Sequence, residues 1–238
     1  MPKPTEEQKK RPTALSWHLW LWPALLLAAG TLLCRFLPLD QRVSGLFYAP
    51  AHGTWAGDTM LPVRWIQWFG DYPSVLLGMA GLWLAVALLG PVELRPWRRA
   101  GIYLVISLAL CHILVNPVLK KHYNRARPKE TALFNGNRPF TPVLNPPATD
   151  EEGRSFPSGH AAAGFAFVAL FFAFRDHRPR LARWGLALGL AHGLVNGLGR
   201  VLQGAHFPSD ILWSFGVVWF TCLALYRWWH VPRLTPRE

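Results

Sequence analysis

The stretch RSFPSGHAAAGFAF, residues 154–167, carries a polar loop directly into an apolar run. His160 stands at the threshold of that run, and a polar side chain beside hydrocarbon is costly unless something compensates it. Ser158 is a candidate N-cap, because it precedes Gly159 and an apolar helical pattern. The unpaired N–H groups of such a first turn, together with the helix dipole, favour anions. His160 is therefore either a reactive group beside an anion site or an interfacial histidine.

Beyond this stretch, the composition is that of a membrane protein. Charged residues make up 16% of the 238 residues, well below the roughly 25% of a soluble domain. The net charge of +12 is divided among short clusters between apolar runs, which is typical of a polytopic membrane protein. We therefore expect the bilayer, and no nucleic acid, as a partner. Cys34, Cys111 and Cys222 lie inside apolar runs without short spacing, so we expect free thiols.

Six apolar runs each approach the ~20 residues that a membrane-spanning helix needs. The first follows a basic flank, but it is long for a signal peptide and no small-residue cleavage site follows it, so we expect it to be retained. We predict an all-α fold: a single membrane-embedded domain, 1–238, with six transmembrane helices in a bundle. The predicted spans are 17–37, 73–90, 101–119, 159–175, 183–200 and 209–229.

Two features orient the chain relative to the membrane. The segment at about 59–70 carries Trp65, Trp68 and Phe69 among polar residues, as an interfacial helix would. An even number of spans places both termini on one side. Of the 25 Lys and Arg residues, 14 lie on that side and 11 on the other. The positive-inside rule then predicts cytoplasmic termini.

A basic segment, KKHYNRARP, covers residues 120–128 at the end of the third predicted span. Lys120 and Arg127 are seven residues apart, close to two helical turns, so both can face one direction. Pro128 biases Arg127 away from helical geometry and marks the expected helix end. Alone, such a cluster also fits anchoring to lipid headgroups.

A third polar segment, GRVLQGAHFPSDILW, covers residues 199–213. Arg200 ends the fifth predicted span, and His206 and Asp210 are four residues apart around the start of the sixth. A carboxylate bonded to one imidazole nitrogen fixes the tautomer and makes the other nitrogen a better nucleophile or base. The alternative is a structural His–Asp pair.

The predicted topology brings the three polar segments to one side of the membrane. Cations, an anion-binding helix start and two histidines, one of them backed by a carboxylate, suit transfer of a phosphoryl group. The sequence contains no carboxylate cluster for magnesium, so we expect no metal and no cofactor.

The three segments resemble the signature of the type 2 phosphatidic acid phosphatase superfamily. The matching patterns are K-x6-RP from Lys120, PSGH ending at His160, and R-x5-H-x3-D from Arg200 to Asp210. One departure is Gly199, where the family usually has Ser, and it removes a hydroxyl near the phosphate. The vanadium haloperoxidases share this site, but they are soluble, and six spans argue against them.

The resemblance implies a role for each matched residue. His206 would be the nucleophile that forms a phosphohistidine, Asp210 would orient and charge-balance it, and His160 would be the general acid. The phosphate oxygens would be held by Lys120, Arg127, Ser158, Gly159 and Arg200. The family works without a metal. Its membrane members have a six-helix core with the active site outside, which here implies the bacterial inner membrane and the periplasmic side.

The resemblance also implies a lipid phosphate or pyrophosphate as substrate: lipid A, phosphatidylglycerol phosphate, phosphatidic acid or undecaprenyl pyrophosphate. Residues 199–213 are similar to bacterial members of the lipid A phosphatase group.

Three other interpretations stay open. The first is a phosphotransferase that passes the phosphate to a lipid acceptor. The second is an anion transporter whose conduit includes His192 and Asn196. The third is a metal site built from His122, His160, His206 and Asp210, against which the basic neighbours argue because they repel a cation.

Overall fold

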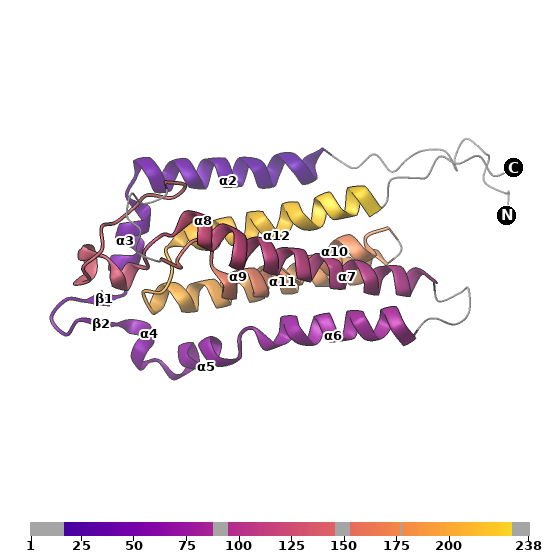
Figure 1. Ribbon diagram of the computed structural model, residues 1–238, viewed down its shortest axis with the longest axis horizontal. Helices are drawn as coiled ribbons and strands as arrows, with labels where there is room; N and C mark the ends of the chain where they lie inside the picture. The colour runs from indigo at the N-terminus through magenta and orange to yellow at the C-terminus, as the bar shows by residue number, and fades with distance from the viewer. Residues whose placement is uncertain (1–16, 88–94, 146–152, 177, 230–238) are drawn as a thin grey trace, which may run out of the picture.

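The computed structural model describes residues 17–87, 95–145, 153–176 and 178–229. In this part of the chain, loops connect the helices and one two-stranded hairpin. The elements, labelled as in Figure 1, are α2 (His18–Phe36), α3 (Leu39–Gly45), β1 (Tyr48–Ala49), β2 (Thr54–Trp55), α4 (Ala56–Thr59), α5 (Leu61–Phe69), α6 (Tyr72–Ala87), α7 (Arg95–Ile113), the π-helix η2 (Leu114–Lys120), α8 (Lys121–Tyr123), the 3₁₀ helices η3 (Pro128–Glu130) and η4 (Ala132–Phe134), α9 (Gly159–Phe165), α10 (Val168–Phe174), α11 (Pro179–Leu202) and α12 (Pro208–Trp229).

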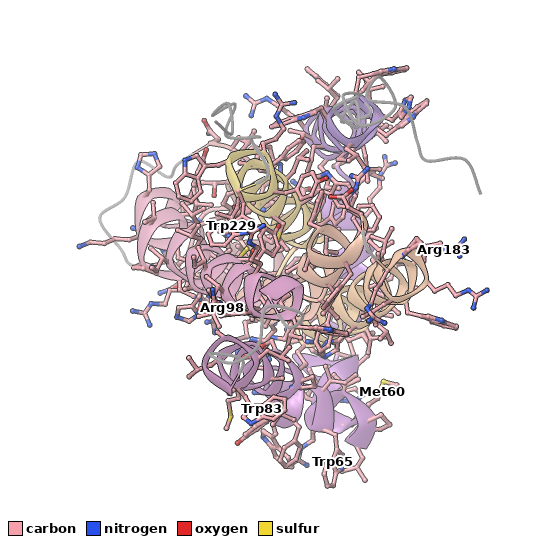
Figure 2. The ribbon with its side chains drawn as sticks, turned by 90° about the vertical axis from the view of Figure 1, so that its right-hand side faces the viewer. Met60, Trp65, Trp83, Arg98, Arg183 and Trp229 are labelled. Atoms are coloured by element: carbon pink, nitrogen blue, oxygen red, sulfur yellow. The ribbon has the colours of Figure 1, made fainter. Side chains whose placement is uncertain are left out.

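The long helices run side by side in one bundle (Figure 1). Helices α9 and α10 pack against α11, α12 packs against α2 and α9, and α6 packs against α7. The outer helices α2 and α6 present large apolar side chains outward, among them Trp22 with 64% and Trp83 with 66% of its surface exposed. Figure 2 shows Trp83 pointing away from the bundle. Apolar surface of this extent marks contact with lipid.

Four helical stretches are long and apolar enough to cross a membrane: His18–Phe36, Trp97–Glu130, Pro179–Leu202 and Pro208–Trp229. The other two predicted spans coincide with shorter apolar helices. Helix α6 is described over 16 residues, and Gly159–Phe174 consists of α9 and α10, joined at Ala166 and Phe167. The all-α prediction is thus confirmed for the described residues, and the count of six spans stays a prediction.

The chain direction places the polar segments together. Helix α2 begins and α12 ends at one end of the bundle, while the opposite end collects α3, the β1–β2 hairpin, α5, α8 and the start of α12 (Figure 1). The predicted interfacial segment forms α5, in which Val63 is buried and Trp65 and Trp68 are exposed. The charge count included Lys and Arg residues near both termini, and these lie outside the described residues. So do residues 88–90 of the second predicted span.

Glycines allow α9 to approach α11 closely. A Cβ atom added at Gly164 would collide with the backbone of Gly193, and one added at Gly193 would overlap the ring of Phe165. Small residues at such crossings let helix backbones meet within a bilayer, where dispersion contacts replace the hydrophobic effect as the driving force.

We predict that Gly193→Ala destabilises the protein, because its methyl group would overlap the Phe165 ring. Overpacking of this kind lowers the free energy of unfolding by about 1–3 kcal/mol. Gly78→Ala is the matched control, since its Cβ atom would lie at an ordinary 3.6 Å from Leu108. Thermal unfolding in one detergent should show a lower Tm for Gly193→Ala and an equal or higher Tm for Gly78→Ala; equal values for both would contradict the prediction.

Candidate active site

The first turn of α9 is built as the sequence predicts. Ser158 is buried, and its Oγ atom accepts a hydrogen bond from the Ala161 N–H at 3.3 Å, so it is the N-cap. Gly159 lies against the end of η2: a Cβ atom there would be 3.0 Å from Nζ of Lys120 and 3.1 Å from Oδ1 of Asn116. The missing side chain therefore lets the lysine reach the positive end of the helix.

Lys120 and Arg127 reach the site by different routes. Lys120 is the last residue of η2, and its Nζ atom donates to Oδ1 of Asn116 at 3.0 Å. The predicted helix through Arg127 is wrong: α8 ends at Tyr123, and Asn124 takes a left-handed conformation with φ 44°. A loop, and not a second helical turn, carries Arg127 to the site.

The cations of the site outnumber the carboxylates near them, which are Glu130, 3.9 Å from Nε of Arg127, and Asp71, which acts on Lys120 and Arg200. Lys120, Arg127 and Arg200 lie close enough to act electrostatically on one another, and Arg154 acts on Lys120 as well. Arg200 is 7% exposed, and one of its terminal nitrogens donates to Oε1 of Gln203 at 2.7 Å. The Nε atoms of Arg127 and Arg200 are buried without a hydrogen-bond partner in the described structure. Buried, unused guanidinium donors are what a phosphate requires.

His206 is held by a backbone carbonyl. Its Nδ1 atom lies 2.6 Å from the carbonyl oxygen of Ser155, whereas Oδ2 of Asp210 is 3.7 Å away. The spacing suggested a direct hydrogen bond between His206 and Asp210. The structure has a longer ion-pair contact there, because Nδ1 of His206 donates to the Ser155 carbonyl instead. A carbonyl only accepts, so Nδ1 carries the proton and Nε2 keeps its lone pair.

Burial lowers the pKa of His206 to about 4. Asp210 opposes this shift, and the positive charges of Arg200 and Lys120 reinforce it. At neutral pH the imidazole is therefore uncharged, which is the state that a nitrogen nucleophile needs.

Asp210 is fully buried and its oxygens are saturated. Oδ2 accepts from the Ser155 hydroxyl at 2.6 Å and from the Phe207 N–H at 2.8 Å, while Oδ1 accepts from Arg125 at 2.5 Å. Sequence reasoning missed Ser155 and Arg125, although both stand inside the quoted segments. The signal was available for Arg125, since a buried carboxylate requires a cationic partner.

His160 lies at the exposed side of the site. Its side chain is 28% exposed, and Nε2 is 3.6 Å from Oδ2 of Asp71, a residue that the sequence did not single out. The charges of Arg200 and Lys120 act on it, so the structure places it with the same cations as His206. The backbone oxygen of His160 accepts from the buried Asn196 amide at 3.1 Å, and the same amide donates to the Gly70 carbonyl at 2.9 Å.

These contacts concern two of the open interpretations, the anion transporter and the metal site. The Asn196 amide connects helix α11 to α9 and to Gly70 at the end of α5, and it lies 3.3 Å from His192 one turn earlier in α11, which is helix–helix hydrogen bonding. Among the described residues, no three His, Cys, Asp or Glu side chains come together as metal ligands do. Gly199 also acquires a packing reason, since a Cβ atom there would press on Ile66 of α5 at 3.1 Å.

Comparison with known proteins points to one family. The model of the PAP2 superfamily matches residues 100–233, a range that contains all eight predicted site residues. A lipid A 1-phosphatase of Rhizobium johnstonii is 34% identical over 206 residues, covering 80% of this chain and 78% of the relative. A lipid A 4'-phosphatase of Francisella tularensis subsp. novicida is 24% identical over 214 residues, covering 88% and 94%.

A relative with a shorter match carries a different name. Phosphatidylglycerophosphatase B of Bacillus subtilis is 31% identical over 110 residues, which cover 44% of this chain and 46% of that protein. No solved structure matches this chain.

The lowered pKa of His206 predicts a pH-dependent stability. The unfolded chain takes up a proton near the ordinary pKa of 6.5 and the folded one only near 4, so this contribution is complete above pH 6.5 and is lost as the pH falls toward 4. We expect the Tm of the wild type to fall more steeply between pH 7 and pH 5 than that of His206→Asn, whose amide can still donate to the Ser155 carbonyl. Parallel Tm curves for the two proteins would contradict the assignment.

Proposed function

This chain belongs to the PAP2 superfamily, and we propose that it removes a phosphate from a membrane lipid by transferring it to Nε2 of His206. The chain is a lipid phosphatase, which is the activity that the names of its relatives share. The observation that carries the mechanism is the 2.6 Å contact between Nδ1 of His206 and the Ser155 carbonyl. It keeps the proton on Nδ1 and leaves a neutral nucleophile beside cations that outnumber the carboxylates near them.

In the first step, the lone pair of Nε2 forms a bond to phosphorus while the bond from phosphorus to the lipid oxygen breaks. The leaving oxygen takes a proton from His160. Lys120, Arg127 and Arg200 neutralise the phosphoryl oxygens, and Ser158 and the Gly159 N–H at the start of α9 add hydrogen bonds. The unused Nε donors of the two arginines support this role.

In the second step, water attacks phosphorus and His160 accepts its proton. The N–P bond breaks, and its electron pair returns to Nε2. A lipid hydroxyl in place of water would give phosphotransfer by the same route. The partial exposure of His160, 28% of its side chain, supports hydrolysis because water reaches the residue that must activate it.

The proposed substrate is a phosphate monoester of lipid A. Two relatives that cover most of this chain are named lipid A phosphatases, one acting at the 1-position and one at the 4'-position. Phosphatidylglycerol phosphate is the second candidate, because the relative with the shorter match is named phosphatidylglycerophosphatase B. Phosphatidic acid and undecaprenyl pyrophosphate present the same chemistry to the site.

The proposed setting is the bacterial inner membrane. The four long apolar helices support a multi-pass protein, and the two shorter apolar helices, α6 and α9–α10, complete a proposed set of six spans in one domain. With six spans and cytoplasmic termini, the end of the bundle that carries His160 and His206 faces the periplasm, where the phosphates of a lipid in the outer leaflet are accessible.

Catalysis is expected to depend on His206 and not on an added metal. Purified protein should release phosphate from lipid A bisphosphate micelles in excess EDTA, and His206→Ala should lower kcat by more than about 1000-fold because the nucleophile is lost. His52→Ala, at an exposed histidine of the β1–β2 hairpin, is the control and should match the wild type.

Free phosphate and products are measured together in this assay. Phosphorylated acceptor lipid without free phosphate would indicate phosphotransfer, and full activity of His206→Ala would overturn the mechanism. Phosphate flux through liposomes without hydrolysis would restore the transporter interpretation.

Lys120 and its neighbour Lys121 offer a matched pair. Lys120 lies against Gly159 at the start of α9, whereas Lys121 is exposed. We expect Lys120→Ala to lower kcat/KM by about 100- to 1000-fold, since one cation of the transition state is lost. Lys121→Ala should change kcat/KM by less than about twofold, because an exposed lysine makes no such contact. Equal effects of the two substitutions on phosphate release would rule out the assigned phosphate contact.

A further inference from the structure

A buried ion-pair cluster lies beside His206 and is formed by residues other than the proposed phosphate-binding cations. Arg125 is its centre: its terminal nitrogens lie 2.5 Å from Oδ1 of Asp210 and 2.8 Å from Oδ2 of Asp40. Arg125, Asp40 and Asp210 are each at most 2% exposed. The ring of Phe207 covers the guanidinium, with 4.4 Å between the Cζ atom and the ring centroid.

Asp40 comes from a part of the chain that carries no recognised motif. It belongs to α3, far outside the range 100–233 that the family model matches. Its Oδ1 atom accepts from the Ser209 N–H at 2.9 Å, and Oδ2 accepts from the Ser209 hydroxyl at 2.6 Å and from Arg125. The thiol of Cys34 also lies beside it. Asp40 thus touches both the first turn of α12 and the partner of Asp210.

The charges in this cluster do not cancel. Arg125 supplies one positive charge and the two carboxylates supply two negative ones, so one negative charge remains. With Arg125 and Asp210 alone the sum would be zero. In a site of low dielectric constant, such a difference of one charge has a large effect on a nearby ionising group.

We propose that Asp40 is a positioning residue whose carboxylate neutralises Arg125, so that the charge of Asp210 stays available to the phosphorylated form of His206. The inference rests on the proposed function. When Nε2 bonds to phosphorus and Nδ1 keeps its proton, the imidazole ring becomes a cation. Asp210, 3.7 Å from Nδ1, can then balance this positive charge, because Arg125 does not already cancel the negative charge of its carboxylate.

The second half of the reaction needs the same charge. Breaking the N–P bond returns the electron pair to the ring, and this is fast only while Nδ1 holds its proton. Without the negative charge that Asp40 secures, the phosphorylated ring loses that proton more readily and becomes a poorer leaving group. Asp40 therefore acts on kcat through Arg125, Asp210 and His206, and it makes no contact with the substrate.

The first test is Asp40→Asn, which keeps the shape of the side chain and removes its charge. On lipid A bisphosphate micelles we expect kcat to fall about 10- to 100-fold, by analogy with side chains that orient metal ligands, with KM changed less than about threefold. Labelled phosphate on His206, trapped by alkaline quench, should also persist longer. Asp176→Asn is the control: Asp176 accepts from Tyr226 at 2.7 Å near the other end of the bundle and should leave kcat unchanged.

The second test separates charge from structure. The double variant Asp40→Asn with Arg125→Gln removes one charge of each sign and therefore has the net charge of the wild-type cluster. We expect its kcat to exceed that of Asp40→Asn at least fivefold. If Asp40 only supports the fold, the double variant should be worse than the single one, because two buried partners are lost instead of one.

The outcomes are distinct. A wild type that releases no phosphate from any lipid offered ends the proposed function. An active wild type with an equally active Asp40→Asn overturns only this inference, and so does a double variant no faster than the single one. If Asp40→Asn is not monodisperse in detergent, the double variant alone tests the inference: a kcat of at least a tenth of the wild-type value supports it, and a lower kcat contradicts it. If neither variant folds, Asp40 is structural and the inference is wrong.

Discussion

The ion pair between Arg125 and Asp210 is the contact on which the site depends. Arg125 stands in the loop that leaves α8, and Asp210 in the first turn of α12, 85 residues later. Asp210 in turn binds the Ser155 hydroxyl, whose backbone carbonyl holds His206. Removing one partner of a fully buried pair costs about 3–5 kcal/mol, because the other charge is left without compensation. His206, the proposed nucleophile, therefore keeps its orientation only while three separate segments remain joined.

The same basic segment supplies cations for two different purposes. Arg125 pairs with the buried carboxylates, while Lys120 and Arg127 interact electrostatically with Arg200 at the proposed phosphate site. Because the carboxylates Asp40 and Asp210 are saturated by Arg125 and by hydroxyl and amide donors, they do not compete with a phosphate for the outer cations. The two fully buried carboxylates are thus committed to Arg125, while two other carboxylates, those of Asp71 and Glu130, lie 3.6 Å from His160 and 3.9 Å from Arg127.

The sequence predicts what local spacing controls. The cap at Ser158, the helical nature of the apolar runs and the gathering of three polar segments at one end follow from short-range patterns and chain direction. The direct partner of His206 could not be predicted in this way, since the Ser155 carbonyl is a backbone group that leaves no mark in the pattern. Asp40 was equally hidden, because its contact with Arg125 spans 85 residues. The helix through Arg127 failed because Asn124 tolerates a left-handed turn that ends α8 early.

The contrast between the two histidines explains their proposed division of labour. The side chain of His206 is 3% exposed and its Nδ1 proton is donated to a carbonyl, so it exchanges protons with water less readily than His160 does. The side chain of His160 is 28% exposed, and it lies beside the half-exposed carboxylate of Asp71. A nucleophile must stay unprotonated and gains from burial, whereas a general acid must be recharged after each cycle and needs contact with water. The difference in burial therefore favours the proposed roles, nucleophilic attack for His206 and proton transfer for His160, because an exchange of roles would require the buried residue to regain a proton from water in each cycle.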